Sequence, residues 1–323
     1  MKVIRISQVK ETGVLTLAGT AGECTFLPSS PDHLIGEIPA GTEKDFGTTG
    51  PKLYTEGIRQ YCRKGQKMKN IRGFLIDLDG VLYVGNQVIK GARESINLLR
   101  ERKYKFRFVS NTTRKCRKTI TERLSFMGFD IPVEYIFTPS FATVAYIKNS
   151  GKKHCYLLTT GDVHQDFEQE CICDSPASVD YVILGDAGER VTYDSLNSAF
   201  RHLMQGADLI ALENDRYWMA PDGLSLSAGP FVQALEFATG KTATIMGKPS
   251  KTFFELALRD MGLRADQVAM IGDDILTDIG GARSIGMQGI LVRTGKFRKD
   301  ALENAVVKPS CIIESIAQIQ DIL

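Results

Sequence analysis

The chain has 323 residues, of which 43% are hydrophobic and 24% are charged, and its formal net charge is +2. This composition is typical of a soluble globular protein with about two domains. The small net charge gives no extended basic surface, so nucleic acid is not expected as a partner. No apolar run approaches the ~18 residues that a membrane span needs, so a membrane is not expected either. Seven scattered cysteines, an odd number, favour reduced thiols and a cytoplasmic location over a disulfide framework.

Residues 1–69 differ from the remainder of the chain. They contain clusters of Gly, Ser, Thr and Pro, few periodic stretches, and a basic cluster near their end. We interpret them as a solvated, partly disordered extension of unknown role, with a weak strand near 13–18. Met68 directly precedes the first clear strand, so a translation start at Met68 is a second interpretation of this segment.

From residue 70 onward, apolar runs of strand length alternate with stretches of helical periodicity. The expected strands are 72–77, 105–109, 154–159, 180–184, 208–212, 243–246, 267–271 and 288–292. The expected helices are 91–103, 115–127, 139–149, 193–204, 229–239, 250–261 and 276–286. Such alternation predicts an α/β fold in which helices cover both faces of a parallel sheet.

The first strand ends in two aspartates. Residues 74–76 have the continuous apolar character of a buried parallel strand, and Asp77 and Asp79 follow it directly. The reactive crevice of an open α/β sheet lies beyond the carboxyl ends of its strands, and residues i and i+2 of an extended segment point the same way. Two such close carboxylates require a cation such as Mg²⁺ or one raised pKa. The alternative is an ordinary loop in which Asp side chains bond the local backbone.

Two further strand ends carry polar groups. Ser110, Asn111 and Thr112 follow the strand at 105–109, where a hydroxyl and free backbone N–H groups form a phosphate cradle or, alternatively, the N-cap of a helix. Lys248 lies between a strand and a helix and is flanked by glycine and proline. Its ammonium suits a phosphoryl group and a carboxylate, although most lysines are surface residues.

A fourth strand, at 267–271, runs into an acidic cluster. Asp273 is best placed to complete a site for a hard cation with oxygen ligands. Asp278 could orient a metal-bound water or Lys248 from behind the metal ligands, and Asp274 could cap the following helix or share the metal site. The sequence leaves these roles open.

Taken together, the Asp-x-Asp, Ser, Lys and acidic motifs, in this order on successive strand ends, resemble the haloacid dehalogenase-like (HAD) superfamily of aspartate-nucleophile phosphatases. The resemblance covers about residues 70–323. It implies a Rossmann-like three-layer α/β/α core with a parallel sheet, formed by residues 70–149 and 243–323. The nearly 140 residues between Ser110 and Lys248 leave room for an inserted α/β cap of the C2 type at 150–242.

The same resemblance assigns roles in catalysis. Asp77 would be the nucleophile, Asp79 the acid and base, and Lys248 a charge partner. Asp77, the Asp79 carbonyl and Asp273 would hold Mg²⁺, while Ser110 and the N–H groups of Asn111 and Thr112 would bind phosphate.

In the cap, Arg216, Tyr217 and Trp218 are expected to contact substrate, with packing inside the cap as the alternative, above all for the single Trp. The resemblance therefore implies a Mg²⁺-dependent phosphatase that hydrolyses a small phosphorylated metabolite through an aspartyl-phosphate, with pyrophosphate or P–N bonds as further targets. The alternatives are a catalytically silent binding or regulatory protein and a phosphotransferase or phosphomutase. A homodimer that pairs through the cap is also expected.

Overall fold

The computed structural model describes residues 15–19, 22–26, 68, 70–171, 178–220 and 222–323. The chain divides into two units, residues 1–52 and 53–323. In the first unit, β1 (Leu15–Gly19) and β2 (Gly22–Phe26) pair as an antiparallel two-stranded sheet, and β1 overlaps the weak strand expected near 13–18. The other residues of the predicted extension up to 67 lie outside the described residues.

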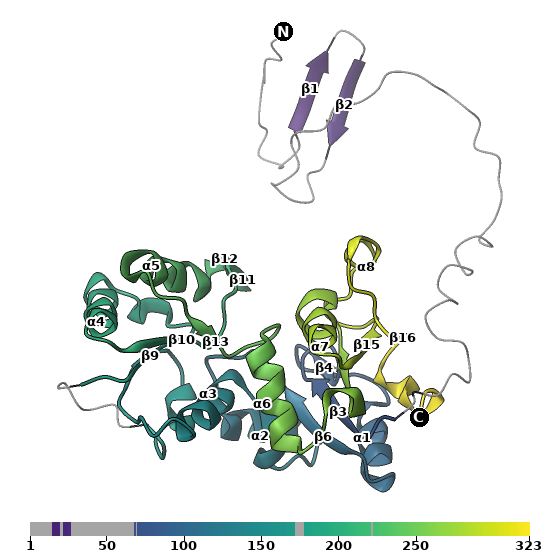
Figure 1. The fold of residues 1–323 in the computed structure, drawn as a ribbon. Coiled ribbons are helices and arrows are strands. Elements are labelled where there is room, and N and C mark those ends of the chain that lie inside the picture. Colours follow the sequence, from purple (N-terminus) through teal and green to yellow (C-terminus); the bar gives the residue numbers. More distant parts are fainter. Residues whose placement is uncertain (1–14, 20–21, 27–67, 69, 172–177, 221) are drawn as a thin grey trace. The chain divides into compact units, whose positions relative to one another are not determined.

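The second unit is built on a six-stranded parallel sheet (Figure 1). Its strand order is β16 (Cys311–Ile313), β15 (Gln288–Val292), β14 (Val268–Gly272), β3 (Gly73–Asp77), β6 (Lys105–Val109) and β7 (Ile136–Phe137). Helices cover both faces of this sheet, so the predicted α/β fold with a parallel sheet is confirmed.

The two faces of β3 belong to different layers of the core. Phe74 and Ile76 pack on one face with α1 (Ala92–Glu101), α2 (Arg117–Phe126) and the 3₁₀ helix η6 (Ile316–Asp321). Leu75 points to the other face, which is covered by α3 (Pro139–Lys148), α6 (Lys251–Met261) and α7 (Gly281–Ser284). Because both faces are buried, β3 can be apolar throughout until it reaches Asp77.

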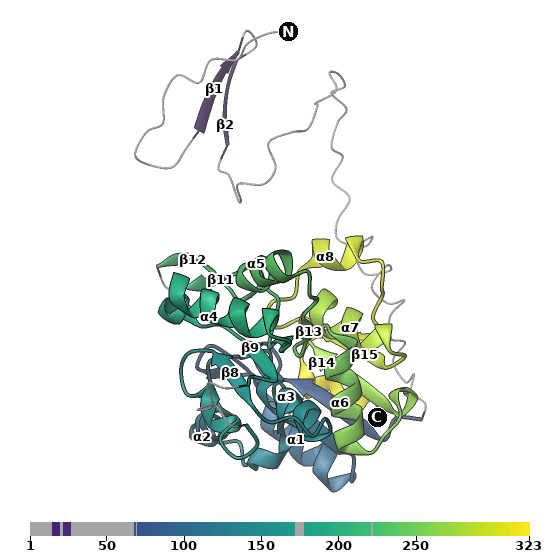
Figure 2. The same ribbon diagram turned by 60° about the vertical axis from the view of Figure 1, so that its left-hand side comes forward.

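A smaller parallel sheet has the order β13 (Thr244–Ile245), β10 (Asp208–Ala211), β9 (Tyr181–Leu184) and β8 (Cys155–Leu158). The helices α4 (Tyr193–Met204) and α5 (Gly229–Thr239) pack on one of its faces (Figure 2). We expected 243–246 to belong to the core, but β13 pairs with β10. The smaller sheet therefore extends beyond the predicted boundary at residue 242.

The remaining elements are short. The strands β4 (Tyr83–Val84) and β5 (Gln87–Val88) form one hairpin, and β11 (Tyr217–Ala220) and β12 (Gly223–Leu226) form another. The last α-helix is α8 (Lys299–Asn304). Short helical turns are η1 (Val133–Tyr135), η2 (Val163–Asp166), η3 (Gly188–Arg190), η4 (Ala265–Gln267) and η5 (Ile275–Gly280).

Two further expectations can be compared with the structure. Cys116, Cys155 and Cys171 are buried free thiols, in line with the preference for reduced thiols over a disulfide framework, whereas Cys311 is disulfide-bonded and departs from it. None of the helices within the described ranges has the length and apolar character required to cross a bilayer.

Candidate active site

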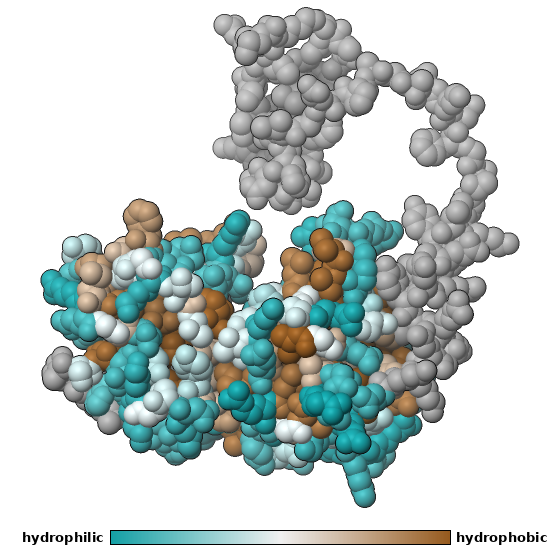
Figure 3. Space-filling model, viewed as in Figure 1, coloured by the Kyte–Doolittle hydropathy of each residue, from teal (hydrophilic) through white to brown (hydrophobic). Residues whose placement is uncertain are grey.

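The predicted motifs meet at the carboxyl ends of β3, β6 and β14, around a cavity of about 510 Å³. Figure 3 shows this face of the molecule hollowed between the part that carries α5 and the part that carries α8. Nine predicted site residues line the cavity: Asp77, Asp79, Ser110, Asn111, Thr112, Lys248, Asp273, Asp274 and Asp278. Of the residues predicted in the cap, Trp218 also lines the cavity, whereas Arg216 and Tyr217 do not.

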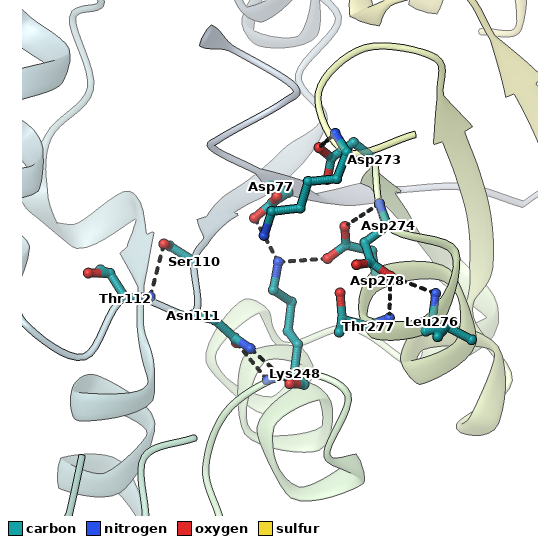
Figure 4. A network of polar contacts seen from close by, with 11 residues as sticks. Asp77, Ser110, Asn111, Thr112, Lys248, Asp273, Asp274, Leu276, Thr277 and Asp278 are labelled. Atoms are coloured by element: carbon teal, nitrogen blue, oxygen red, sulfur yellow. Dashed lines mark hydrogen bonds and ion pairs between the residues drawn. The ribbon is translucent and has the colours of Figure 1, made fainter. Parts of the chain in front are cut away.

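Lys248 bridges two buried carboxylates at the centre of the site (Figure 4). Its Nζ donates to Oδ1 of Asp77 and to Oδ1 of Asp278, each at 2.6 Å. The three residues are only 6%, 9% and 1% exposed, respectively. Water screens such a bridge poorly, so the attraction between the ammonium and the two carboxylates is strong.

Burial and charge act in opposite directions on these groups. Burial raises the pKa of the Asp77 carboxyl above its usual value, and the Lys248 ammonium opposes this effect. Burial also raises the pKa of Asp278, to about 6, again against Lys248. Burial alone would lower the pKa of Lys248, but Asp278 and Asp77 outweigh it, so the pKa is raised and the lysine stays charged.

A cluster of oxygen donors suited to a divalent cation lies beside this bridge. Carboxylate oxygens of Asp77, Asp273 and Asp278 lie within 4.8 Å of one another. Oxygen donors in this number and charge fit Mg²⁺, a hard cation. Burial raises the pKa of Asp273 to about 6, although its Oδ2 accepts a 2.6 Å hydrogen bond from the Lys296 N–H.

The residue after Asp79 must be small for Asp273 to fit. Gly80 has φ +84°, and a Cβ added there would lie 1.8 Å from Oδ2 of Asp273. The Asp-x-Asp-Gly sequence is thus explained by close approach of the backbone to the acidic cluster. Asp79 itself is exposed at the cavity, unlike Asp77.

The acidic residues after β14 have distinct contacts. Asp274 accepts hydrogen bonds from the N–H groups of Leu276 and Thr277, at 2.8 and 3.0 Å, and so caps η5. Asp278 uses one oxygen for Lys248 and the other to accept from the Asp274 N–H at 3.2 Å. Of the roles left open, these contacts favour the helix cap for Asp274 and the support of Lys248 for Asp278.

The segment after β6 forms a turn ahead of the next helix. The Thr112 N–H donates to the Ser110 hydroxyl at 3.2 Å. The N-cap of α2 is Cys116, so the alternative that Ser110 caps this helix is wrong. Both polar ends of the Asn111 side chain bond the backbone of Lys248, at 2.8 and 2.9 Å. These bonds engage the side-chain amide of Asn111, whereas the contact expected with phosphate is through its backbone N–H.

The smaller sheet and its loops supply the opposite wall of the cavity. Glu213 is buried and accepts from the N–H groups of Asp215 and Ala228 and from the Ser227 hydroxyl, so its carboxylate holds the loop together. Burial raises its pKa above the usual value. Trp218 lies under the Arg114 guanidinium, 5.4 Å from the ring centre.

Sequence reasoning missed Arg114, which lines the cavity and also lies 3.7 Å from Asp186. Its position four residues after Ser110 was the one available signal. Its partners Asp186 and Trp218 are 72 and 104 residues further along the chain, so no local pattern identifies them.

Comparison with known proteins places the chain in a family. Residues 74–172 match a haloacid dehalogenase-like hydrolase model, and residues 245–319 match a HAD-hydrolase-like model. A human phospholysine phosphohistidine inorganic pyrophosphate phosphatase is 37% identical over 265 residues, covering 80% of this chain and 96% of that protein. The human haloacid dehalogenase-like hydrolase domain-containing protein 2 is 40% identical, with 78% and 95% covered. The chain therefore belongs to the haloacid dehalogenase-like hydrolases.

Solved structures agree with this placement. A 4-nitrophenylphosphatase from Thermotoga maritima matches with a TM-score of 0.71 at 27% identity, covering 77% of this chain and 96% of the other. A p-nitrophenyl phosphatase from Archaeoglobus fulgidus matches with a TM-score of 0.72 at 26% identity, covering 79% and 100%. The predicted resemblance to this family is confirmed.

Proposed function

We propose that this hydrolase is a Mg²⁺-dependent phosphatase that acts on a small phosphorylated metabolite through an aspartyl-phosphate on Asp77. The main support is the convergence of Asp77, Lys248, Asp273 and Ser110 on one cavity, although they lie on four separate stretches of the chain. A cavity of about 510 Å³ suits a small molecule rather than a macromolecule.

Asp77 has the contacts expected of a nucleophile. The charged lysine 2.6 Å away favours its ionised form, and one carboxylate oxygen remains for attack on phosphorus. When that oxygen attacks, the bond from phosphorus to the leaving oxygen breaks, and Asp79 donates a proton to the leaving oxygen. Asp79 then takes a proton from the water that attacks phosphorus, which breaks the phosphorus–Asp77 bond and releases phosphate.

Exposure suits Asp79 to this second role. It lies at the cavity but outside the buried lysine bridge, so its carboxyl is open to the leaving oxygen and to the attacking water, and the proton that it takes from the water restores the acid for the next turnover. Asp77 and Asp273, with the backbone carbonyl of Asp79, would hold Mg²⁺. The positive charge of the ion would offset the negative charge on the oxygens of the transferring phosphoryl group. Ser110 and the N–H groups after it would bind the remaining oxygens.

The alternatives have less support. A silent binding protein would have no need of the nucleophile, the acid and base, and the charge partner together, and all three residue types are present. A phosphomutase typically excludes water under a differently placed cap, whereas the insertion here follows the Ser110 motif by a long interval. The names of the relatives include phosphatases of pyrophosphate and P–N bonds, and these substrates belong in the first panel to be tested.

The homodimer through the cap is also a proposal. In the hairpin of β11 and β12, Tyr217 pairs with Leu226 and Met219 pairs with Leu224, and all four side chains are more than half exposed. Burial of this apolar face against a second copy would stabilise a dimer. Light scattering with size-exclusion chromatography tests it, and a monomer at micromolar concentration would contradict it.

A phosphate-release screen tests the activity. Purified full-length protein is incubated with p-nitrophenyl phosphate, pyrophosphate, phosphoamino acids, sugar phosphates and nucleotides, with Mg²⁺ or with EDTA. The proposal expects release that depends on Mg²⁺ and is lost in Asp77→Asn. A trapped phosphoryl group on Asp77, identified by mass spectrometry after borohydride treatment, would support the covalent route. Release that persists unchanged in Asp77→Asn would refute the assignment.

A further inference from the structure

The Asn111 side chain holds the backbone of Lys248 from both sides. Its Oδ1 accepts from the Lys248 N–H at 2.8 Å, and its Nδ2 donates to the Lys248 carbonyl at 2.9 Å (Figure 4). The paired bonds resemble those that a neighbouring strand would make. Within the described part of the chain, neither backbone group of Lys248 has another hydrogen-bond partner.

The residue before Lys248 is shaped for this contact. A Cβ added at Gly247 would lie 3.2 Å from Oδ1 of Asn111 and 2.6 Å from the carbonyl oxygen of Leu212. Any larger residue would therefore push the lysine segment away from Asn111. On its other side, the Gly247 carbonyl accepts from the Ser250 N–H at 3.0 Å, so the turn is fixed.

The lysine side chain depends on where this peptide is held. Lys248 reaches both Asp77 and Asp278 at 2.6 Å from inside a site that is nearly closed to water. A shift of its backbone would lengthen both ion pairs, and misplacement by about 1 Å can reduce the rate ~10²-fold. The amide oxygen and one amide N–H of Asn111 are both committed to the Lys248 backbone, which orients the side chain toward this peptide.

We propose that Asn111 is a positioning residue, whose side-chain amide fixes the Lys248 peptide so that the ammonium is held between Asp77 and Asp278, and that this side chain affects catalysis through Lys248 rather than through a contact with phosphate. The catalytic consequence rests on the proposed phosphatase function. The clamp, meaning the two hydrogen bonds between the Asn111 amide and the Lys248 backbone, does not rest on that function, because it is a property of the folded chain.

A double-mutant cycle separates the two roles of Asn111. Asn111→Ala should lower kcat for p-nitrophenyl phosphate by roughly 10–100-fold and change KM less than about threefold. In a Lys248→Ala background, the same substitution should change kcat and the Kd of inorganic phosphate less than about threefold. Multiplicative losses in both backgrounds would overturn the proposal, because a phosphate ligand acts without Lys248.

Hydrogen exchange at the Lys248 amide gives a readout that needs no turnover. Asn111→Ala should accelerate this exchange by about tenfold or more, because the N–H loses its partner. Unchanged exchange would refute the clamp. Failure of the wild-type protein to release phosphate would refute only the proposed function. Asn149→Ala is the matched control, since this amide bonds Ala145 on α3 and does not line the cavity. Thermal melts verify that each variant is folded.

Discussion

Replacement of Lys248 by methionine should reduce stability more than any single surface substitution. The ammonium neutralises two carboxylates, each 2.6 Å away, and all three groups are buried. Methionine retains most of the side-chain volume but leaves Asp77 and Asp278 facing each other without a counter-ion. Removal of one partner from a buried ionic group costs about 3–5 kcal/mol. For a chain of this size, that corresponds to a lower Tm on the order of 10 °C.

The loss should depend on pH in a defined direction. Without the ammonium, burial and mutual repulsion raise the pKa values of Asp77 and Asp278 further, so the native state binds more protons than the unfolded state. Stability of Lys248→Met should therefore fall as the pH rises from about 5 to 8. Its Tm should lie closest to that of the wild type at the acidic end.

Differential scanning fluorimetry without Mg²⁺, across this pH range, measures the effect. Lys148→Met is the matched control, because Lys148 pairs with Glu170 at an exposed site, where an ion pair contributes roughly 0–1 kcal/mol. Asp77→Asn combined with Lys248→Met should recover part of the lost Tm, because it removes one of the uncompensated charges. A Tm for Lys248→Met that matches the wild type at pH 8 would refute the reasoning.

Other expectations are simpler to examine. Asp77→Asn should lower phosphate release by at least ~10³-fold, and activity within tenfold of the wild type would contradict this prediction. The Tm of this variant should stay within a few degrees of the wild type, because Lys248 keeps Asp278 as a partner. EDTA should abolish turnover, and added Mg²⁺ should restore it, whereas full activity after chelation would exclude the metal. Phe253→Ala, at a fully buried ring between α6 and the sheet, should destabilise the protein by about 3–5 kcal/mol in urea unfolding, and a loss below 1 kcal/mol would argue against this packing.

Much of the fold could be predicted because its elements have strong local signals. The ranges expected for β6, β15, α4 and α5 match the structure residue for residue. Short elements such as β7 and β16 escaped prediction, since two or three residues give no measurable period. The hairpin of β11 and β12 was missed because its strands have only four residues each and their large apolar side chains are mostly exposed, so no buried run identifies them.

The helix predicted at 276–286 is divided, and the reason lies in the site. Residues Ile275–Gly280 form a π-helical turn, and α7 begins only at Gly281. Helical periodicity does not distinguish these forms, and the π-helical turn is the segment that carries Asp278 with its contacts to Lys248 and to the Asp274 N–H. Turns of this kind are frequent at functional sites.

The candidate site was predictable to the extent that strand ends identify it. Motifs at strand ends indicated Asp77, Ser110 and Asp273, because the parallel strands β3, β6 and β14 deliver their last residues to one edge. Lys248 was indicated by a fourth motif, but it follows β13 of the smaller sheet. The contact between Asn111 and Lys248 joins residues 137 positions apart, so no local pattern reveals it. Of the three cap candidates, Trp218 lines the cavity and Arg216 and Tyr217 do not, because the alternation of side chains along β11 separates Trp218 from Tyr217.

The place of β13 has a mechanical consequence. Ile245 is tied to the smaller sheet through its pairing with Ala211, and Lys248 follows only three residues later. The Met246 N–H also donates to the Ala211 carbonyl at 2.8 Å, so if the smaller sheet rotates to admit a substrate, the pivot on this side of the cavity is confined to the short stretch between this bond and Lys248. Such a rotation would displace the peptide of Lys248, whose ammonium lies between Asp77 and Asp278. Opening of the cavity and the electrostatics of the site are therefore coupled through this short stretch of backbone.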